Sequence, residues 1–371
     1  MKTVNFLANP SSPHVRQWDM VLQQCGMQTI VHGITQQVGS AVLVKHARSV
    51  GPSWLGRLPA PLAYALTGLW LRFQSIFGKP LANFVHAHNT SGYGLMARLS
   101  GLPYIITTYG TEIYTAPHKG FWYRRMIRSV LTHAQFITSS SPQMTDALVN
   151  QLHIPRQRIQ EIYLGVAPVF LFSEYARKKG RSALCIPPEA KVWIANRRMT
   201  PLYRTVELVQ AFIQFSQQAS DAHLILIEGD ADAGYRQQVH DTVTRGFGRV
   251  HIIRGFLTQD QLAQWLCTAD FSISIPLSDQ LSSSILESMR CRTVPVLGKL
   301  PAYQAITGAA EWVRLDHKEL HANLVEMFRS TNAFTAEEML KKQQLTSIVI
   351  NELDRKDVIA KAVHALYQFS F

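Results

Sequence analysis

Two carboxylates bracket a serine-rich segment in the C-terminal half of the chain. Asp279 and Glu287 lie on either side of Ser282, Ser283 and Ser284. An apolar strand pattern precedes this segment and a helical pattern follows it, so the serines are expected at a helix N-terminus. Unpaired backbone N–H groups and the positive end of the helix dipole favour an anion there. We therefore predict a ligand with central phosphates and hydroxyls at both ends, such as a nucleotide-sugar. A Ser- and Asp-rich cap without a ligand is the alternative interpretation.

A basic run directly follows another predicted strand, Lys191–Ala195, and contains Arg197 and Arg204. Ligands of open α/β sheets bind at the carboxyl ends of the strands. Guanidinium groups at that edge can neutralise a diphosphate leaving group through charge-assisted hydrogen bonds. These two arginines are therefore candidate catalytic residues, the alternative being a solvated basic turn.

Several polar residues of the N-terminal half follow predicted strands in the same way. His88 ends a strand pattern, and Tyr109 and Glu112 follow the next one, so all three are candidates for ligand contact. For Glu112 the alternative is an ion pair with nearby arginines. His86 is expected to point to the opposite face from His88, which argues against a metal site made by the pair.

The C-terminal motif resembles a known signature. The pattern D-x7-E, followed by S-M-x-C and a V-P-V strand, is similar to the E-x7-E signature of the retaining GT-B glycosyltransferases of the GT4 type. The resemblance implies that Asp279 touches hydroxyls of the donor sugar and that Glu287 holds the nucleotide ribose. It places Arg197 on the diphosphate, and Arg204 can supply the second cation, which is a Lys in the family.

Weaker motifs in matching order extend the resemblance over nearly the whole chain. Phe256 and Leu257 lie in a segment like the one whose backbone contacts the nucleobase. The resemblance places His88 beside the donor sugar or its phosphates. Tyr109 stands where many members have His, and Glu112 corresponds to the acidic position of a T-x-H-G-x-[DE] segment. A His-x-Arg-x-Trp match assigns His14 and Arg16 to the acceptor or phosphate side, to which Tyr109 and Glu112 are assigned as well.

The chain is long enough for two domains. Its 371 residues exceed what one hydrophobic core usually serves, and 47% apolar with 17% charged residues is ordinary for a folded protein. Strand and helix patterns alternate and then restart near residue 191, which predicts two parallel, doubly wound α/β domains. We predict the GT-B fold, two Rossmann-like domains facing a cleft. The expected parts are an acceptor-side domain 1–168, a nucleotide-sugar-binding domain 169–350, and a C-terminal helical segment 351–371 that the resemblance packs back on the first domain.

Positive charge is concentrated in the first half. Residues 1–172 hold 14 Lys and Arg against 4 Asp and Glu, whereas the remainder hold 23 against 21. A basic face implies a polyanionic partner. Two segments favour an anionic membrane surface: Trp54–Phe77 is strongly apolar but interrupted by Arg and Pro, and Phe121–Arg128 mixes aromatics with arginines. A buried helix, or a helix docked on the other domain, is the alternative for Trp54–Phe77. No motif of a nucleic-acid binder accompanies the charge.

The prediction is a retaining glycosyltransferase, hexosyltransferase-like and metal-independent, with the nucleoside-diphosphate sugar as co-substrate and no other cofactor. The expected acceptor is a saccharide or lipid-linked molecule in cell-surface polysaccharide synthesis. Four dispersed cysteines and the lack of a secretory pattern predict a cytoplasmic protein, peripheral at the inner face of the membrane. The alternatives are a GT-B sugar-nucleotide epimerase or hydrolase, and a non-catalytic nucleotide-sugar-binding or membrane-docking protein.

Overall fold

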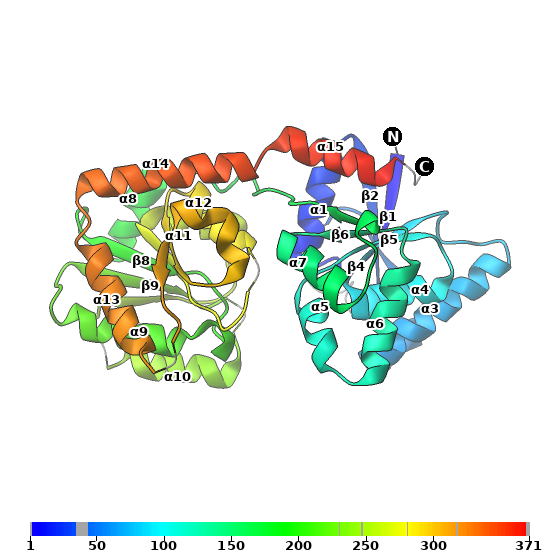
Figure 1. Cartoon of the computed structure of the whole chain (residues 1–371), viewed down its shortest axis with the longest axis horizontal. Coiled ribbons are helices and arrows are strands. Elements are labelled where there is room, and N and C mark those ends of the chain that lie inside the picture. Colours follow the sequence, from blue (N-terminus) through cyan, green and yellow to red (C-terminus); the bar gives the residue numbers. More distant parts are fainter. Residues whose placement is uncertain are drawn as a thin grey trace. The chain divides into compact units, whose positions relative to one another are not determined.

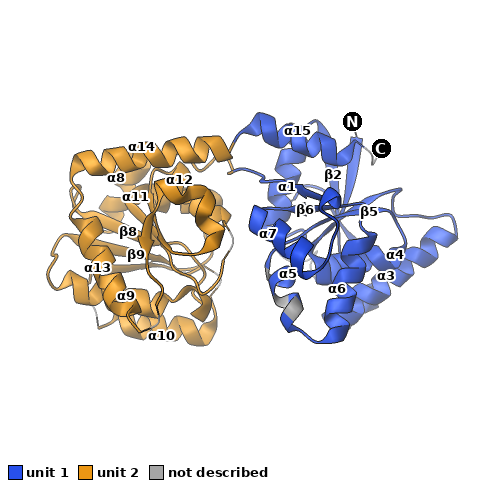
Figure 2. Cartoon of the chain, in the orientation of Figure 1, with its two compact units in different colours: residues 1–165, 355–371 blue, residues 166–354 orange. Residues whose placement is uncertain are grey.

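The structure, a computed structural model, describes residues 2–34, 44–229, 231–245, 248–279, 281–316 and 318–368. The chain divides into two compact units (Figure 2), of which unit 1 comprises residues 1–165 and 355–371 and unit 2 comprises residues 166–354. Each unit is an α/β layer structure built on one parallel sheet. The predicted fold class of two parallel-sheet α/β domains is therefore confirmed.

Unit 1 contains a seven-stranded parallel sheet. In spatial order its strands are β3 (Ala47–Val50), β2 (Met27–Ile34), β1 (Lys2–Leu7), β4 (Val85–His88), β5 (Tyr104–Thr107), β6 (Phe136–Ser139) and β7 (Ile159–Glu161). Its α-helices include α1 (Pro13–Gln24), α3 (Ala60–Ile76), α4 (Gly94–Ser100), α5 (Thr111–Thr115), α6 (Phe121–His133), α7 (Pro142–Asp146) and α15 (Lys356–Tyr367).

Apolar side chains cover both faces of this sheet because successive strand residues point to opposite sides. Leu7 faces the core beneath α3, α4 and α6, whereas Phe6 belongs to the core formed with α1 and α15. The last helix, α15, thus packs within unit 1, and the Tyr367 hydroxyl lies 2.5 Å from His86 Nδ1. Figure 1 shows α15 beside α1 and close to the N-terminus.

Unit 2 contains a six-stranded parallel sheet. Its strands in spatial order are β10 (Val250–Ile253), β9 (Ala222–Ile227), β8 (Lys191–Ala195), β11 (Phe271–Ser274), β12 (Val294–Gly298) and β13 (Glu311–Val313). Its helical segments include α8 (Glu174–Ala183), η6 (Pro201–Tyr203), α9 (Thr205–Ser216), α10 (Ala233–Val243), α11 (Gln259–Thr268), α12 (Ser283–Arg290), η7 (Pro301–Ala309), α13 (Leu320–Asn332) and α14 (Ala336–Leu353).

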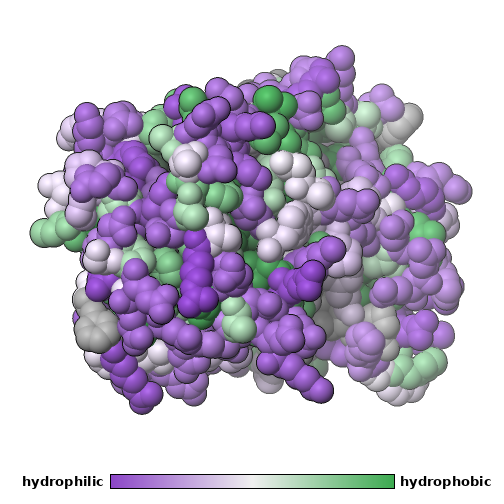
Figure 3. Space-filling view, turned by 60° about the vertical axis from the view of Figure 1, so that its left-hand side comes forward, coloured by the Kyte–Doolittle hydropathy of each residue, from purple (hydrophilic) through white to green (hydrophobic). Residues whose placement is uncertain are grey.

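Aromatic rings fill the core of unit 2. Trp193 stacks on Phe271 at a centroid distance of 5.5 Å and meets Phe328 edge-on at 5.4 Å. The indole N–H, which would be costly to bury unpaired, donates to Thr331 Oγ1 at 3.1 Å. Hydrophilic residues dominate the face drawn in Figure 3, with smaller hydrophobic groups among them.

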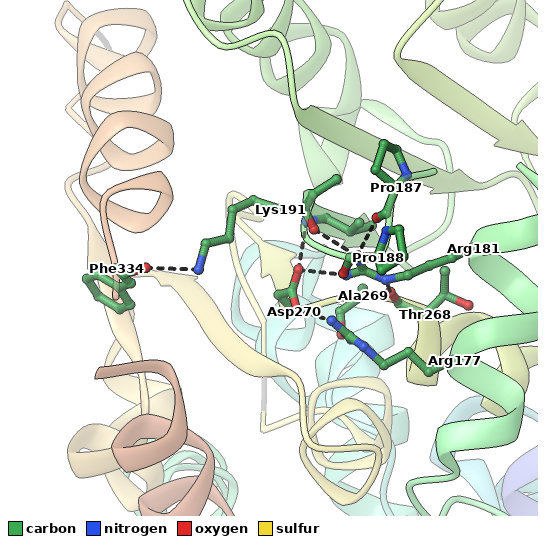
Figure 4. Close-up of polar contacts among 11 residues, drawn as sticks. Arg177, Arg181, Pro187, Pro188, Lys191, Thr268, Ala269, Asp270 and Phe334 are labelled. Atoms are coloured by element: carbon green, nitrogen blue, oxygen red, sulfur yellow. Dashed lines mark hydrogen bonds and ion pairs between the residues drawn. The ribbon is translucent and has the colours of Figure 1, made fainter. Parts of the chain in front are cut away.

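A buried ion cluster closes the sheet of unit 2 at the amino ends of its central strands (Figure 4). The carboxylate of Asp270 forms ion pairs with Arg177 at 2.6 Å and with Arg181 at 3.0 Å. It also accepts a hydrogen bond from the backbone N–H of Val192 at 2.9 Å. Arg181 donates further to backbone carbonyls, among them that of Thr268 at 3.2 Å. These bonds satisfy charges that would otherwise be expensive to bury. The cluster therefore connects α8 to β8 and β11 at the edge opposite the carboxyl ends of the strands.

Strand order reverses at one place in each sheet. The chain moves outward from β1 through β2 to β3 and then resumes at β4, on the other side of β1. In unit 2 the same reversal separates β8 from β11. The loops at the carboxyl ends of such a strand pair diverge and leave a crevice in which ligands of this fold class bind.

Candidate functional site

The loops after β8 and β11 bring the predicted donor residues of unit 2 together at its strand-order reversal. Arg197, two residues beyond β8, forms an ion pair with Asp279, with Nη2 2.9 Å from Oδ2. The two side chains are only 8% and 11% exposed. The backbone N–H of Leu277 donates to the carbonyl of Leu202 at 2.9 Å, which joins the two loops. Residues separated widely in the sequence thus form one site.

Arg197 connects this ion pair to the start of α12. Its Nη1 donates to the hydroxyl of Ser284 at 2.6 Å and also contacts the hydroxyl of Ser282. Its guanidinium lies over the ring of Tyr203, 4.4 Å from the centroid, and donates to the Tyr203 hydroxyl. Burial by itself would lower the pKa of Arg197, but the charge of Asp279 together with the neighbouring Tyr203 and Tyr303 more than offsets it, and the pKa is raised. The guanidinium is therefore a fixed cation at the helix N-terminus.

Helix α12 begins with the serines of the predicted motif. Ser282 is its N-cap residue, and Ser283 and Ser284 occupy its first turn. The backbone N–H groups of a first turn lack intrahelical partners, and the helix dipole adds positive potential there. Asn196 supports this turn by donating to the Ser284 carbonyl at 3.1 Å and to the Ser288 hydroxyl at 3.2 Å. The arrangement can accept an anion between the helix tip and Arg197.

Glu287 lies in the second turn of α12 and is half-buried. Burial raises the pKa of its carboxyl to about 7, against the opposing effects of a hydrogen bond from Ser283 and the charge of Arg197. A carboxyl with such a pKa can donate as well as accept hydrogen bonds near neutrality. This property suits a hydroxyl-bearing ligand such as a ribose.

Arg204 supplies a second cation in the loop after β8. It adopts a left-handed backbone conformation with φ of 52° between η6 and α9, and only 4% of the residue is exposed. Within the described part of the chain, its Nη1 is buried without a hydrogen-bond partner. Buried guanidinium groups are ordinarily paired, so an unpartnered Nη1 indicates an anionic ligand.

Phe256 and Leu257 lie between β10 and α11, at the carboxyl edge of the same sheet. The Phe256 side chain is 75% exposed and Leu257 is half-buried. An aromatic ring that stays exposed at this edge is available to a flat ligand group. Their predicted contact with the nucleobase stays a prediction.

The predicted residues of unit 1 gather around its own strand-order reversal. His88, at the end of β4, is buried, and its Nδ1 lies 2.7 Å from the hydroxyl of Tyr109. Burial, with His86 and His14 nearby, holds the pKa of His88 well below its ordinary value, and burial raises that of Tyr109. The imidazole is therefore neutral and the phenol protonated. Among the residues that the structure describes, Nε2 of His88 has no partner.

The expectation that His86 and His88 point to opposite faces was wrong. Their ring centroids lie 4.5 Å apart, because residues two apart along a strand share a face. His86 is occupied on both nitrogens, by Tyr367 and by Thr107 at 2.8 Å. It therefore supports the core.

Glu112, at the start of α5, organises the loop after β4. Its carboxylate accepts the backbone N–H groups of Thr90 and Ser91 at 2.5 and 3.0 Å, and also contacts the Ser91 hydroxyl. These bonds bring Glu112 to the segment that follows His88. The predicted ligand contact of Glu112 stays a prediction.

His14 and Arg16 lie in the first turn of α1. The exposed ring of His14 stacks on Tyr109 at a centroid distance of 4.9 Å, which places it at the same reversal as His88. Arg16 is half-buried in the same turn. The structure thus collects His14, Tyr109 and His88 in one ring-lined cluster, with Arg16 close in sequence.

Sequence reasoning gave no role to two residues that hold the donor-side network. The Tyr303 hydroxyl, from η7, donates to Asp279 Oδ2 at 2.7 Å, and Asn196 fixes the first turn of α12. Both follow the carboxyl end of a parallel strand, β12 for Tyr303 and β8 for Asn196. Their position just after the carboxyl end of a strand is the sequence signal by which both residues could have been found.

Comparisons with known proteins agree with this arrangement. Residues 22–165 match the family described as Glycosyl transferase 4-like domain. No curated protein matches the sequence. Among solved structures, sucrose-phosphate synthase from Thermosynechococcus elongatus is 14% identical, with a TM-score of 0.78 over 100% of this chain and 99% of that chain.

Two further structures are similar over the whole length. Anabaena HepE in complex with UDP-glucose is 14% identical, with a TM-score of 0.76 over 99% of this chain and 100% of that chain. A glycosyltransferase from Rickettsia africae is 14% identical, with a TM-score of 0.75 over 99% and 98% of the two chains. The chain shares the GT-B fold of these structures, and its residues 22–165 match the glycosyl transferase 4-like domain.

Proposed function

We propose that this protein transfers a hexosyl residue from a nucleoside-diphosphate sugar to a hydroxyl acceptor. The premise is that a GT-B chain with a match to a glycosyl transferase 4-like domain moves sugars. The observation that carries the proposal is the cationic site of unit 2. There, Arg197 lies against the first turn of α12, and Arg204 is buried nearby in sequence with Nη1 unpartnered. The HepE complex, which contains UDP-glucose, supports a donor of this class.

In the proposed reaction, the acceptor oxygen attacks the anomeric carbon and the bond from that carbon to the phosphate oxygen breaks. The departing phosphate takes the acceptor proton on the same face, so the anomeric configuration is retained. Negative charge grows on the phosphate in the transition state, where Arg197, Arg204 and the α12 N–H groups stabilise it. Loss of one such donor typically costs about 2.7–4 kcal/mol of the activation barrier. We propose that these cations replace a metal ion.

The remaining assignments are parts of the same proposal. Glu287 holds the ribose, Asp279 contacts the sugar, and the loop bearing Phe256 and Leu257 contacts the base. Residues 1–168 supply the acceptor side and residues 169–350 bind the donor. The acceptor is a saccharide or lipid-linked molecule of polysaccharide synthesis at the inner membrane face. Among the described residues, no helix combines the length and apolarity needed to cross a bilayer.

The test starts with thermal-shift screening of nucleoside diphosphates, since a bound donor stabilises the folded state by mass action. Products are then analysed from the matching NDP-sugar with and without acceptor lipids and oligosaccharides. Arg204→Gln should lose NDP binding, while Arg236→Gln, an exposed change in α10, should keep it. Release of free sugar without acceptor would indicate a hydrolase, and an isomerised donor would indicate an epimerase. Binding of NDP-sugar with no turnover over a broad acceptor panel would indicate a non-catalytic protein.

A further inference from the structure

Helix α3 is apolar on two faces, only one of which is covered. Ala63, Thr67 and Leu71 face inward, and Gly68 lies so close to α4 that an added Cβ would approach the Met96 carbonyl to 2.7 Å. The other face carries large apolar side chains at intervals of three or four residues, which places them on one stripe. They are Leu62, Leu66, Leu69, Phe73 and Ile76, exposed by 37% to 72%.

Further exposed apolar residues lie at the two ends of α3 and at the start of α6. Trp54 precedes α3 and Phe77 ends it, with exposures of 57% and 65%. Phe121 and Trp122, at the start of α6, are 68% and 79% exposed. Helix α4 packs against both α3 and α6, and Figure 1 shows the three helices together on one side of unit 1. We call these nine side chains the α3–α6 surface.

The charges around the α3–α6 surface have one sign. Between residues 20 and 145 the sequence contains a single carboxylate side chain, Glu112. Its oxygens already accept the N–H groups of Thr90 and Ser91. Cations on or beside the two helices are exposed, namely Arg57, Arg72, Lys79, Lys119, Arg124, Arg125 and Arg128. The surface is therefore apolar in its centre and cationic at its margins.

We propose that the α3–α6 surface docks on an anionic lipid bilayer, with its apolar side chains in the interfacial layer and its cations on lipid phosphates. Exposed Trp, Phe and Leu beside Arg and Lys is the composition of helices that lie in a membrane interface. A second copy of the chain would bring two cationic margins together. A bilayer with acidic headgroups instead supplies the opposite charge and an apolar layer at once. The docking specifies the membrane location in the proposed function, and it requires no sugar transfer.

The experiment is co-sedimentation of the full chain with vesicles in the absence of nucleotide. We expect binding to vesicles of phosphatidylcholine with phosphatidylglycerol, weaker binding to phosphatidylcholine alone, and weakening by salt. The variant Leu69→Gln/Phe73→Gln/Ile76→Gln should lose at least roughly tenfold in the partition coefficient. Arg72→Gln should lose about fivefold, as one phosphate-facing cation does near an anionic surface.

Matched substitutions in unit 2 are the controls. Leu340, Leu345 and Ile348 are 56%, 37% and 56% exposed on α14, so Leu340→Gln/Leu345→Gln/Ile348→Gln removes three exposed apolar side chains elsewhere. Lys341→Gln is the matched loss of an exposed charge, and both controls should bind vesicles like the parent chain. The proposal is overturned by a stripe variant that binds normally, by a parent chain that ignores anionic vesicles, or by sedimentation velocity showing that the stripe holds a dimer. NDP-induced thermal shifts should be equal in all variants, so failure of docking and failure of the donor site are separately visible.

Discussion

Arg197 and Asp279 neutralise each other in unit 2, and a donor diphosphate would compete with Asp279 for the same guanidinium. Asp279→Asn keeps the shape of the side chain and its contact with Tyr303 but removes the competing charge. We therefore expect it to bind the nucleoside diphosphate more tightly than the parent chain. Arg197→Ala should bind it more weakly. Sugar transfer should slow in both variants. The amide of Asp279→Asn no longer offers a charged acceptor to the sugar hydroxyls, and Arg197→Ala no longer stabilises the charge that grows on the departing phosphate.

The distances give the scale of these effects. Unit charges 2.9 Å apart attract by about 6 kcal/mol at an effective dielectric constant of about 20. Desolvation offsets much of this attraction. Even an exposed ion pair reaches about 1 kcal/mol, so Asp279→Asn should tighten NDP binding roughly fivefold or more. A hydrogen bond to a charged group contributes about 1.5–3 kcal/mol, so Arg197→Ala should weaken it by about 10- to 150-fold.

The assay is isothermal titration of both single variants and the double variant with the nucleoside diphosphate that gives the largest thermal shift. In the double variant, Asp279→Asn should no longer improve binding, because the cation that it releases is gone. Circular dichroism and thermal unfolding check folding, with Arg197→Lys held in reserve if Arg197→Ala is unstable. Weaker NDP binding by Asp279→Asn would refute the reasoning, since the pair would then be needed to build the site.

Three other predictions concern Glu287, Asp270 and metal ions. Because burial raises the pKa of Glu287 from 4.5 to about 7, the folded state holds this proton more tightly than the unfolded chain, and stability should fall as pH rises between those values. Ionising Glu287 above pH 7 costs at most about 3 kcal/mol of folding stability. In thermal scans, Glu287→Gln should therefore raise Tm relative to the parent chain by an amount that grows from pH 4.5 to 7. A Tm difference that does not change with pH would contradict this prediction. Asp270→Asn should lower the free energy of unfolding by about 3–5 kcal/mol in urea titrations, because Arg177 and Arg181 lose their buried counter-ion, whereas Asp357→Asn at an exposed pair should change it little. Removing divalent metals with a chelator should leave the transfer rate unchanged, since Arg197 and Arg204 carry the phosphate charge, and a rate restored only by added Mg²⁺ or Mn²⁺ would contradict this.

The sequence predicted the order of strands and helices because apolar periodicity and strand-end position are local. The pattern placed β8 at Lys191–Ala195, as the structure does. It missed β3 (Ala47–Val50), a polar edge strand, and α8 (Glu174–Ala183), whose exposed basic face conceals its packing on α11. It placed the Trp54–Phe77 segment in a helix-forming apolar region but could not decide whether that helix was buried.

Partners across loops were beyond sequence reasoning. The ion pair of Arg197 with Asp279 depends on β8 and β11 being neighbours, which the pattern alone does not state. The same holds for Cys267, whose thiol donates to the carbonyl of Leu171 at 3.6 Å across 96 residues of sequence. Tyr303 was missed because it lies in η7, a 3-10 segment whose helical geometry is interrupted at Ile306 and which no motif marked. Site residues could be predicted where they belong to one continuous motif. They could not be predicted where their partner comes from a distant part of the sequence that only the fold brings close.

The two strand-order reversals carry different chemistry, and this difference supports the proposed division into a donor side and an acceptor side. In unit 2 the loops at the reversal present two guanidinium groups and a helix N-terminus, which select phosphate. In unit 1 the corresponding loops present a neutral His88, a protonated Tyr109 and the ring of His14. Such groups offer hydrogen bonds and flat apolar surface without net charge, which suits hydroxyl groups and sugar rings. The carboxylate of Glu112 accepts a backbone N–H of the loop after β4, so this loop is held in place without a ligand. Seven exposed cations of unit 1 lie on or beside the helices of the α3–α6 surface, where an anionic bilayer would use them.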